Sequence, residues 1–141
     1  MATQDWQLKS IFDHFVCDVC GKENTPDWLL DEVYRTQRIR RLNDLLRRGQ
    51  ADQATILLTA GVQAAGDDFA TSAVKAMSEF DDFSEDNDPH HEHDFGAFEI
   101  GQEKLFFKID YFDPALERHS DDAADPNVTH RVLTIMLASE Y

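Results

Sequence analysis

Residues 79–113 read EFDDFSEDNDPHHEHDFGAFEIGQEKLFFKIDYFD and join an acidic loop to the clearest β-hairpin of the chain. The segments 95–100 and 104–112 are rich in aromatic and β-branched residues, which are typical of strands. Between them, Gly101 and Gln102 can make a tight turn. We therefore expect the two segments to form a hairpin at the centre of a sheet.

Alternate residues of the second strand differ in character, so its two faces should differ too. The apolar face would carry Leu105, Phe107, Ile109 and Tyr111, and the mixed face Phe106, Lys108, Asp110 and Phe112. A two-stranded hairpin is only marginally stable in water. Another strand or a helix must therefore cover the apolar face.

The loop that precedes the hairpin is acidic and contains no Lys or Arg between residues 79 and 94. Its acidic residues are Glu79, Asp81, Asp82, Glu85, Asp86, Asp88, Glu92 and Asp94. Because like charges repel, we expect an exposed loop here. Phe80 and Phe83 should attach its start to the domain, and the Asp88–Pro89 step favours a turn.

A long helix is expected over residues 26–48. Thr25 can cap it, Pro26 suits its first position, and Gly49 can adopt the left-handed conformation that often ends a helix. The helix holds six of the 13 Lys and Arg residues: Arg35, Arg38, Arg40, Arg41, Arg47 and Arg48. They could contact an anion or a nucleic acid. The simpler interpretation, which we adopt, is that they pair with the acidic loops and suit the helix C-terminus.

Three other segments complete the expected structure. The apolar run 55–59 reads as a buried strand, and residues 67–80 as an amphipathic helix. Asp125 and Pro126 repeat the cap-plus-proline pattern, so a final helix is expected over 126–140. The β-branched residues of this last segment leave a strand open as an alternative.

The expected fold class is α+β. It has a small antiparallel sheet, made of the central hairpin 95–112 and the strand 55–59, and three or four helices pack on it. Parallel pairing of the strand 55–59 stays open, because a helix separates it from the hairpin. Residues 25–141 should form a single domain, and residues 1–24 an N-terminal extension.

The formal net charge of −15 over 141 residues argues against direct nucleic-acid binding, which requires a basic surface. It is compatible with high solubility, a cationic partner or imitation of a polyanion. The chain has no apolar run long enough to span a bilayer, and residues 1–10 lack the features of a signal peptide. Because Cys17 and Cys20 are the only cysteines, no disulfide framework is indicated, and a cytoplasmic protein is expected.

Two groups of residues could bind a metal ion. Cys17 and Cys20 form a C-x-x-C-G turn typical of zinc knuckles, but a second C-x-x-C is missing, so the alternative is a pair of reduced cysteines. His91 and His93 form an H-x-H pair that could place both rings on the same side of an extended segment. With Asp94 they could hold zinc, manganese or iron and activate a water molecule.

The alternative for the histidines is a solvated loop, and several signatures of catalysis are absent. The sequence contains no G-x-S-x-G elbow, P-loop or G-x-G-x-x-G motif. The sequence therefore favours a protein that is not an enzyme. The zinc ion considered above is the only cofactor that we expect as a possibility.

Five blocks of the chain are distinctive: RTQRIRRLND (35–44), ILLTAGVQA (56–64), FDDFSEDNDP (80–89), EHDFGAFEIGQEKLFFKIDYFDPALE (92–117) and DPNVTHRVLTIMLASEY (125–141). Over about residues 34–141 they resemble the DUF3768 family, a domain of unknown function that is frequent in alphaproteobacterial genomes and plasmids. The resemblance implies no established activity and no catalytic residues. It does imply a mobile-element context, since relatives tend to travel on plasmids beside antirestriction-type genes.

Charge and this context together suggest an acidic anti-defence protein of the anti-CRISPR or antirestriction type, which could act as a DNA mimic. Its partner would be a protein with a basic, nucleic-acid-binding surface, and it would be a monomer or homodimer that does not bind DNA or membranes. The carboxylates expected on its partner-binding surface are Asp81, Asp82, Glu85, Asp86, Asp88, Glu92, Asp121 and Asp122. The alternatives are a small metal-dependent enzyme that uses His91, His93 and Asp94, and an acidic interaction domain.

Overall fold

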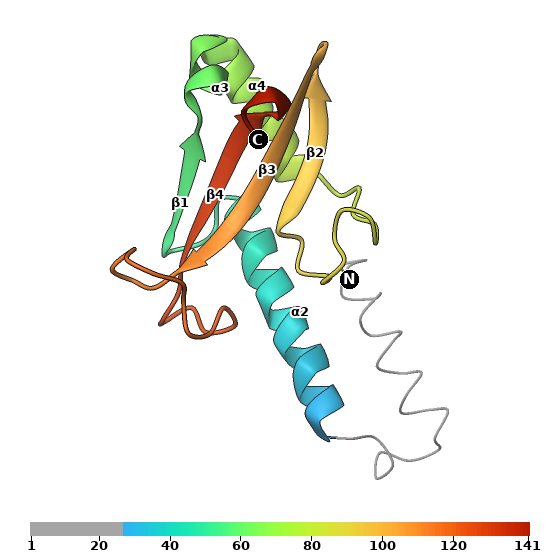
Figure 1. Cartoon of the computed structure of the whole chain (residues 1–141), viewed down its shortest axis with the longest axis vertical. Coiled ribbons are helices and arrows are strands. Elements are labelled where there is room, and N and C mark those ends of the chain that lie inside the picture. Colours follow the sequence, from blue (N-terminus) through green and yellow to red (C-terminus); the bar gives the residue numbers. More distant parts are fainter. Residues whose placement is uncertain (1–26) are drawn as a thin grey trace.

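The structure is a computed structural model that describes residues 27–141 (Figure 1). In chain order the elements are α2 (Asp27–Arg47), β1 (Ala54–Leu58), α3 (Ala60–Ala64), α4 (Asp67–Glu79), β2 (Phe95–Ile100), β3 (Glu103–Phe112), β4 (His130–Leu137) and the 3-10 helix η2 (Ala138–Glu140). The α+β fold class is confirmed. None of the helices in this range is long and apolar enough to cross a membrane.

The four strands form one mixed sheet in the order β1-β4-β3-β2. The hairpin of β2 and β3 is antiparallel, as expected, and β3 is also antiparallel to β4. The first strand, β1, runs parallel to β4, with Thr55 beside Val132. The expected strand 55–59 therefore belongs to the sheet, but it pairs with β4 instead of the hairpin.

The prediction of a final helix over 126–140 is wrong, because most of this segment forms β4. Alternate side chains of β4 are buried, which is the period of a strand, and Val132 and Thr134 are β-branched. As an interior strand, β4 has its backbone groups paired on both sides. Asp125 does not cap a helix; its carboxylate accepts the N–H of Asn127 at 2.9 Å and closes a turn.

The hydrophobic core lies between the sheet and the helices; in Figure 1, α4 passes behind the strands, and α2 reaches the sheet from below. Leu105, Phe107 and Ile109 are buried there, so the predicted apolar face of β3 is confirmed. The core also includes Leu46 of α2, Val62 of α3, Ala73 and Met77 of α4, and Leu133 and Ile135 of β4. The opposite face of β3, with its mixed residues, is only partly covered.

The end of α2 follows the prediction from Gly49. This glycine has a φ of 76°, and its N–H donates to the Leu46 carbonyl at 2.9 Å. The N–H of Gln50 donates to the Leu45 carbonyl at 2.8 Å, which completes a Schellman motif. The predictions for the N-terminal extension, including Cys17 and Cys20, lie outside the described residues.

Candidate functional site

The acidic loop, which we define as residues 80–94 between α4 and β2, is ordered by hydrogen bonds of its own. Asn87 accepts the N–H of Ser84 at 2.8 Å and donates to the carbonyl of Asp82 at 2.9 Å. The N–H of Asp88 donates to the Ser84 carbonyl at 2.7 Å. These bonds close the loop from the inside and fix its backbone despite the repulsion between its charges.

Aromatic side chains attach this loop to the core. Phe80 and Phe83 pack edge to face, with ring centroids 4.9 Å apart, and both rings also pack against Phe107 of β3. On its other side, the Phe83 ring stacks on His93 at 3.8 Å, with 3° between the ring planes. The expectation that Phe80 and Phe83 attach the loop to the domain is confirmed.

Asp88 is a buried support of the loop, although we expected it on the partner-binding surface. Its side chain is only 4% exposed, and Oδ1 accepts the N–H groups of Glu92 and His93, both at 3.0 Å. Burial raises the pKa of Asp88, and these hydrogen bonds offset the effect only in part. The role of Asp88 is therefore to hold the backbone of the loop.

His93 lies between two carboxylates and links the loop to α2. Its Nδ1 is 3.0 Å from Asp44 Oδ1, its Nε2 is 3.6 Å from Asp88 Oδ2, and its side chain is 2% exposed. Arg47 also donates to Asp44 Oδ1, at 2.8 Å. We call Asp44, Arg47, Asp88 and His93 the buried network.

The buried network joins three segments that are far apart in sequence. Arg47 donates to the carbonyls of Phe80 at 2.7 Å and Met77 at 3.3 Å, so it also binds the end of α4. Burial alone would raise the pKa of Asp44, but the hydrogen bonds from His93 and Arg47 outweigh it and lower the pKa below the usual value. The ionised form of Asp44 is therefore the one that the fold stabilises.

A second chain of hydrogen bonds runs from the loop to β4. The Tyr111 hydroxyl donates to Glu92 Oε1 at 2.8 Å and accepts from Asn43 Nδ2 at 2.8 Å. Asn43 Oδ1 in turn accepts from Nε of Arg131 at 2.7 Å. Glu92, which we expected to contact a partner, is half-buried and already bound to Tyr111.

Asp94 lies at the end of the loop, where β2 begins. Burial, together with the negative charges of Glu92 and Asp88, raises the pKa of Asp94 to about 6. Burial also raises the pKa of the nearby Tyr111 hydroxyl, so this group stays protonated. Part of the negative charge of this region is thus neutralised when the pH falls slightly below neutral.

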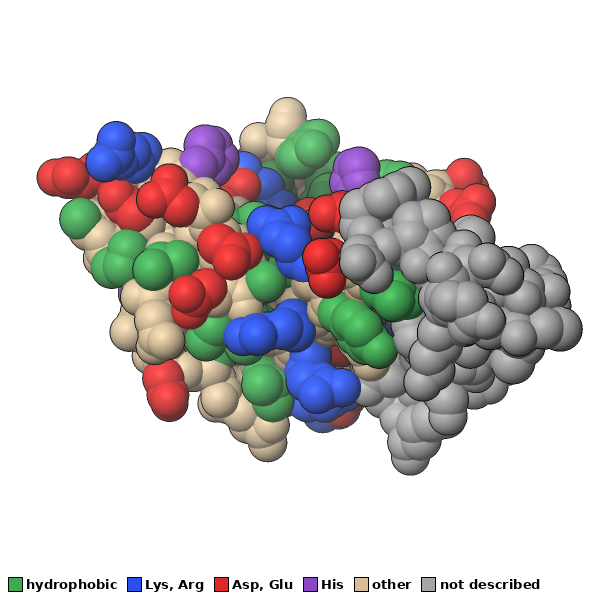
Figure 2. All heavy atoms as spheres, turned by 90° about the horizontal axis from the view of Figure 1, so that it is seen from below, with side chains coloured by type: hydrophobic (Ala, Val, Ile, Leu, Met, Phe, Trp, Pro, Cys, Tyr) green, Lys and Arg blue, Asp and Glu red, His purple; other side chains and the backbone are tan. Residues whose placement is uncertain are grey.

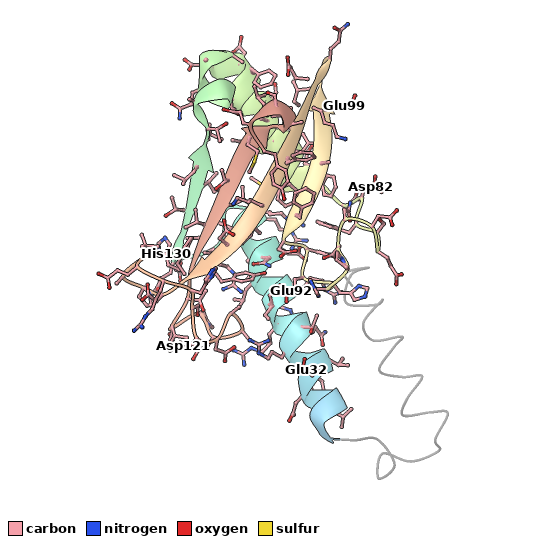
Figure 3. The ribbon with its side chains drawn as sticks, viewed as in Figure 1. Glu32, Asp82, Glu92, Glu99, Asp121 and His130 are labelled. Carbon is pink, nitrogen blue, oxygen red and sulfur yellow. The ribbon has the colours of Figure 1, made fainter. Side chains whose placement is uncertain are left out.

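Of the carboxylates that we expected on the partner-binding surface, those that face solvent lie in two patches on two different loops. Asp81, Asp82, Glu85 and Asp86 are exposed on the acidic loop, and Asp121 is exposed on the loop before β4. In Figure 3, Asp82 and Asp121 lie on opposite sides of α2, so the two patches do not form one surface. On the face seen in Figure 2, acidic and basic side chains are interspersed.

The second patch also includes Asp122, and this carboxylate is paired with a cation. Asp122 Oδ1 pairs with Arg35 of α2 at 3.2 Å, and both side chains are about half exposed. For Arg35, the expected pairing of a helix arginine with an acidic loop is confirmed. Arg47 instead pairs with a carboxylate of its own helix and donates to carbonyls beside the acidic loop.

The residues proposed to bind a metal do not come together in the described structure. In residues 27–141 no group of three or more His, Cys, Asp or Glu side chains is arranged to hold a metal ion. His93 contacts carboxylates through both ring nitrogens, and His91 has a positive φ of 60° rather than the extended backbone we assumed.

Four buried or half-buried residues of these networks were not foreseen: Asn43, Asp44, Tyr111 and Arg131. Asn43 and Asp44 stand between the apolar residues Leu42 and Leu45 of α2. A polar pair at this position needs buried partners, and this was the available signal. Apart from Arg47, which pairs with Asp44, their partners are 49 to 88 residues away in sequence and could not be assigned from it.

The family described as "Protein of unknown function (DUF3768)" matches residues 58–140 of the chain. The match covers α3, α4, the acidic loop and the strands β2, β3 and β4, whereas α2 and all of β1 except Leu58 lie outside it. No curated protein and no solved structure shows a significant match.

Proposed function

The chain belongs to the DUF3768 family of proteins of unknown function, and we propose that its acidic loop is a preorganised docking surface for a basic, nucleic-acid-binding protein. The partner class that fits best is a CRISPR or restriction complex of the host, which would make the protein an anti-defence inhibitor. The alternative is an acidic interaction domain for another basic protein. Competition with duplex DNA distinguishes these two functions.

This proposal is supported by the different positions of the carboxylates in the loop. Asp81, Asp82, Glu85 and Asp86 face solvent, whereas Asp88 is buried beneath them and holds the backbone. A surface that is ordered before binding loses less conformational entropy when it docks. The loop is therefore suited to present its charges at fixed positions.

The charge of the whole chain favours the same kind of partner. A net charge of −15 repels nucleic acid and attracts a cationic protein surface. Carboxylates on an ordered loop can then occupy positions on the partner that DNA phosphates would otherwise contact. Binding by this mechanism would compete with DNA and weaken as the salt concentration rises.

The test is charge reversal of the four exposed loop residues to lysine: Asp81, Asp82, Glu85 and Asp86. The matched control reverses four exposed carboxylates elsewhere: Glu32, Glu99, Glu103 and Glu117. Both variants change the net charge equally, and circular dichroism verifies that both fold. Inhibition is measured as plasmid or phage escape in cells that carry a restriction or CRISPR system, and binding to the purified complex by interferometry.

We expect the loop variant to lose inhibition and binding, and the control variant to retain most of both. Duplex DNA should displace the unmodified protein from the complex. Inhibition that survives reversal of the loop would reject the docking surface. Binding that requires the loop but is insensitive to DNA would leave an acidic interaction domain without DNA mimicry.

No observation favours the metal-dependent enzyme as a second function, because the His93 nitrogens already contact Asp44 and Asp88.

A further inference from the structure

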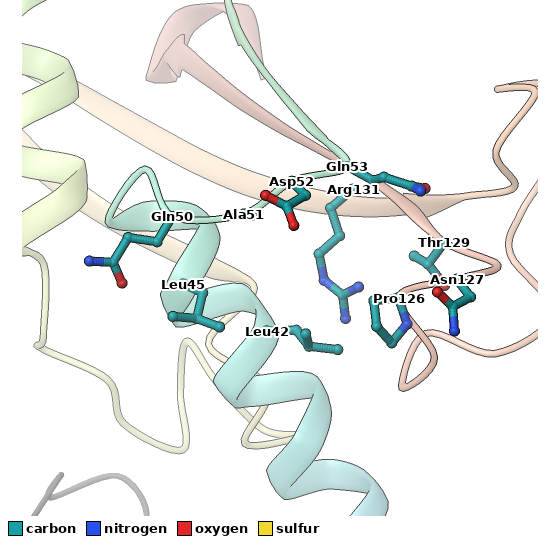
Figure 4. Close-up of a pocket in the computed structure, with 10 residues that line it drawn as sticks. All are labelled: Leu42, Leu45, Gln50, Ala51, Asp52, Gln53, Pro126, Asn127, Thr129 and Arg131. Carbon is teal, nitrogen blue, oxygen red and sulfur yellow. The ribbon is translucent and has the colours of Figure 1, made fainter.

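A cavity of about 300 Å³ lies between the C-terminal half of α2 and the segment that leads into β4 (Figure 4). Leu42 and Leu45 of α2 form an apolar wall, and Gln53, Asn127 and Thr129 contribute polar atoms. Arg131, near the start of β4, extends into the space between these walls in Figure 4. None of the lining residues belongs to the acidic loop, so the cavity is independent of the surface proposed above.

Arg131 is buried, and the partners of its guanidinium are neutral. The residue is 3% exposed; Nε donates to the Asn43 side-chain oxygen at 2.7 Å, and a terminal nitrogen donates to the Ala123 carbonyl. The guanidinium carbon lies 5.1 Å from the centre of the Tyr111 ring. Within the described residues, no Asp or Glu oxygen pairs with Arg131.

A buried cation without a paired carboxylate is costly, because it loses its hydration and gains no opposite charge in return. Burial lowers the pKa of Arg131, and the electrostatic interactions with Tyr111 and Glu92 offset this effect only in part. The guanidinium is always protonated and presents several donors that match a carboxylate or a phosphate. Its position on the wall of a cavity therefore leaves a place where an anion can supply the missing charge.

We infer that this cavity is a binding site for a small anionic ligand, whose carboxylate or phosphate group pairs with Arg131. The Gln53 and Asn127 side chains lie at the cavity and can donate to the rest of the ligand. A volume of about 300 Å³ is at the lower end of small-molecule sites, so the ligand is a small organic acid or a monophosphate rather than a dinucleotide.

Two features oppose an anion in this place, and both can be tested. Asp52 also lines the cavity and repels negative charge. The net charge of −15 acts in the same direction, although salt screens it beyond about 8 Å at physiological ionic strength. Removing the charge of Asp52, which is exposed, should therefore strengthen binding without a cost to the fold.

The experiment titrates inorganic phosphate and, separately, succinate into the full chain at constant ionic strength, with ¹H–¹⁵N NMR as the readout. We expect saturable shifts of the amides around residues 50–53 and 123–131 and of the Arg131 side-chain Nε signal. Asp52→Asn should lower the dissociation constant roughly fivefold. Arg131→Met should abolish saturation, and Lys104→Met, at the far end of β3, should leave it unchanged.

Saturation by phosphate alone assigns a phosphate ligand, and saturation by succinate alone assigns an organic acid. At ten times the dissociation constant, the ligand should also raise the unfolding temperature of the parent by about 5 °C. If Arg131→Met does not fold, the dissociation constant of Asp52→Asn tests the inference in its place. No saturable shift with either anion, shifts that map elsewhere, or weaker binding by Asp52→Asn would overturn the inference.

Discussion

Replacement of Asp44 by asparagine is expected to lower the free energy of unfolding by about 3 kcal/mol, because Asp44 is a buried carboxylate that pairs with Arg47 and His93. Its Oδ1 accepts hydrogen bonds from Arg47 at 2.8 Å and from His93 at 3.0 Å. Asparagine has nearly the same shape and keeps one oxygen acceptor. The substitution therefore removes charge while it disturbs packing as little as a single change can.

The size of the effect follows from burial. The side chains of Arg47 and Asp44 are 3% and 10% exposed, so water cannot replace the lost carboxylate. A hydrogen bond to a charged group contributes about 1.5–3 kcal/mol, and loss of one partner of a buried ion pair costs about 3–5 kcal/mol. We take the lower end because the asparagine oxygen can still accept one hydrogen bond.

The assay is urea unfolding followed by circular dichroism at pH 7, with thermal unfolding in parallel. Asp44→Asn should also lower the unfolding temperature by about 10 °C. The control is Lys75→Gln, which breaks the Lys75–Glu79 pair at 3.3 Å on the surface of α4. Because these two side chains are 72% and 64% exposed, the loss should stay below about 0.5 kcal/mol.

A loss of less than about 1 kcal/mol in Asp44→Asn, with an unchanged urea dependence, would show that the fold does not depend on the charge of Asp44. A second arm tests the cause of the loss. Asp44→Leu combined with Arg47→Met removes both charges, and should be more stable than the sum of the two single substitutions implies. Additive losses in the double variant would show that the two charges do not depend on each other.

Two further predictions concern Asp94 and Gly96. Because the pKa of Asp94 rises from 3.8 to about 6 on folding, the folded chain binds this proton more tightly, and stability should fall as the pH rises from about 4 to 6. Asp94→Asn should thus raise the free energy of unfolding by about 2 kcal/mol at pH 7 and leave it unchanged at pH 4, as measured by urea unfolding. An equal gain at both pH values would exclude titration of Asp94 as the cause. A Cβ on Gly96 would overlap the Phe107 and Phe80 rings, so Gly96→Ala should lower the unfolding temperature by about 5–10 °C. Ala97→Ser, on the opposite face of β2, should change it little, and equal temperatures for both variants would show that the rings can shift.

Elements whose signals are local could be predicted from the amino-acid sequence alone. Gly49 ends α2 because glycine tolerates the positive φ that the Schellman motif needs. The hairpin turn could be predicted at Gly101 for the same reason, because this residue has a positive φ of 62°. The alternation of β3 predicted which side chains face the core, since neighbouring residues of a strand point to opposite faces. Exposure of Asp81, Asp82, Glu85 and Asp86 also followed from sequence, because an uncompensated acidic run favours solvent.

Features that depend on partners far away in sequence could not be predicted and became visible in the folded chain. The segment 130–137 is compatible with a helix or a strand, and it became β4 because β1 and β3 supply hydrogen bonds on both sides. Asp88 and His93 resemble their exposed neighbours in sequence, yet the fold buries them beside each other, where His93 also contacts Asp44. Arg131 gave no local signal, since its burial beside a cavity results from the packing of α2 against β4. Burial of charge depends on which groups the whole fold brings within hydrogen-bonding distance, and that information is not local.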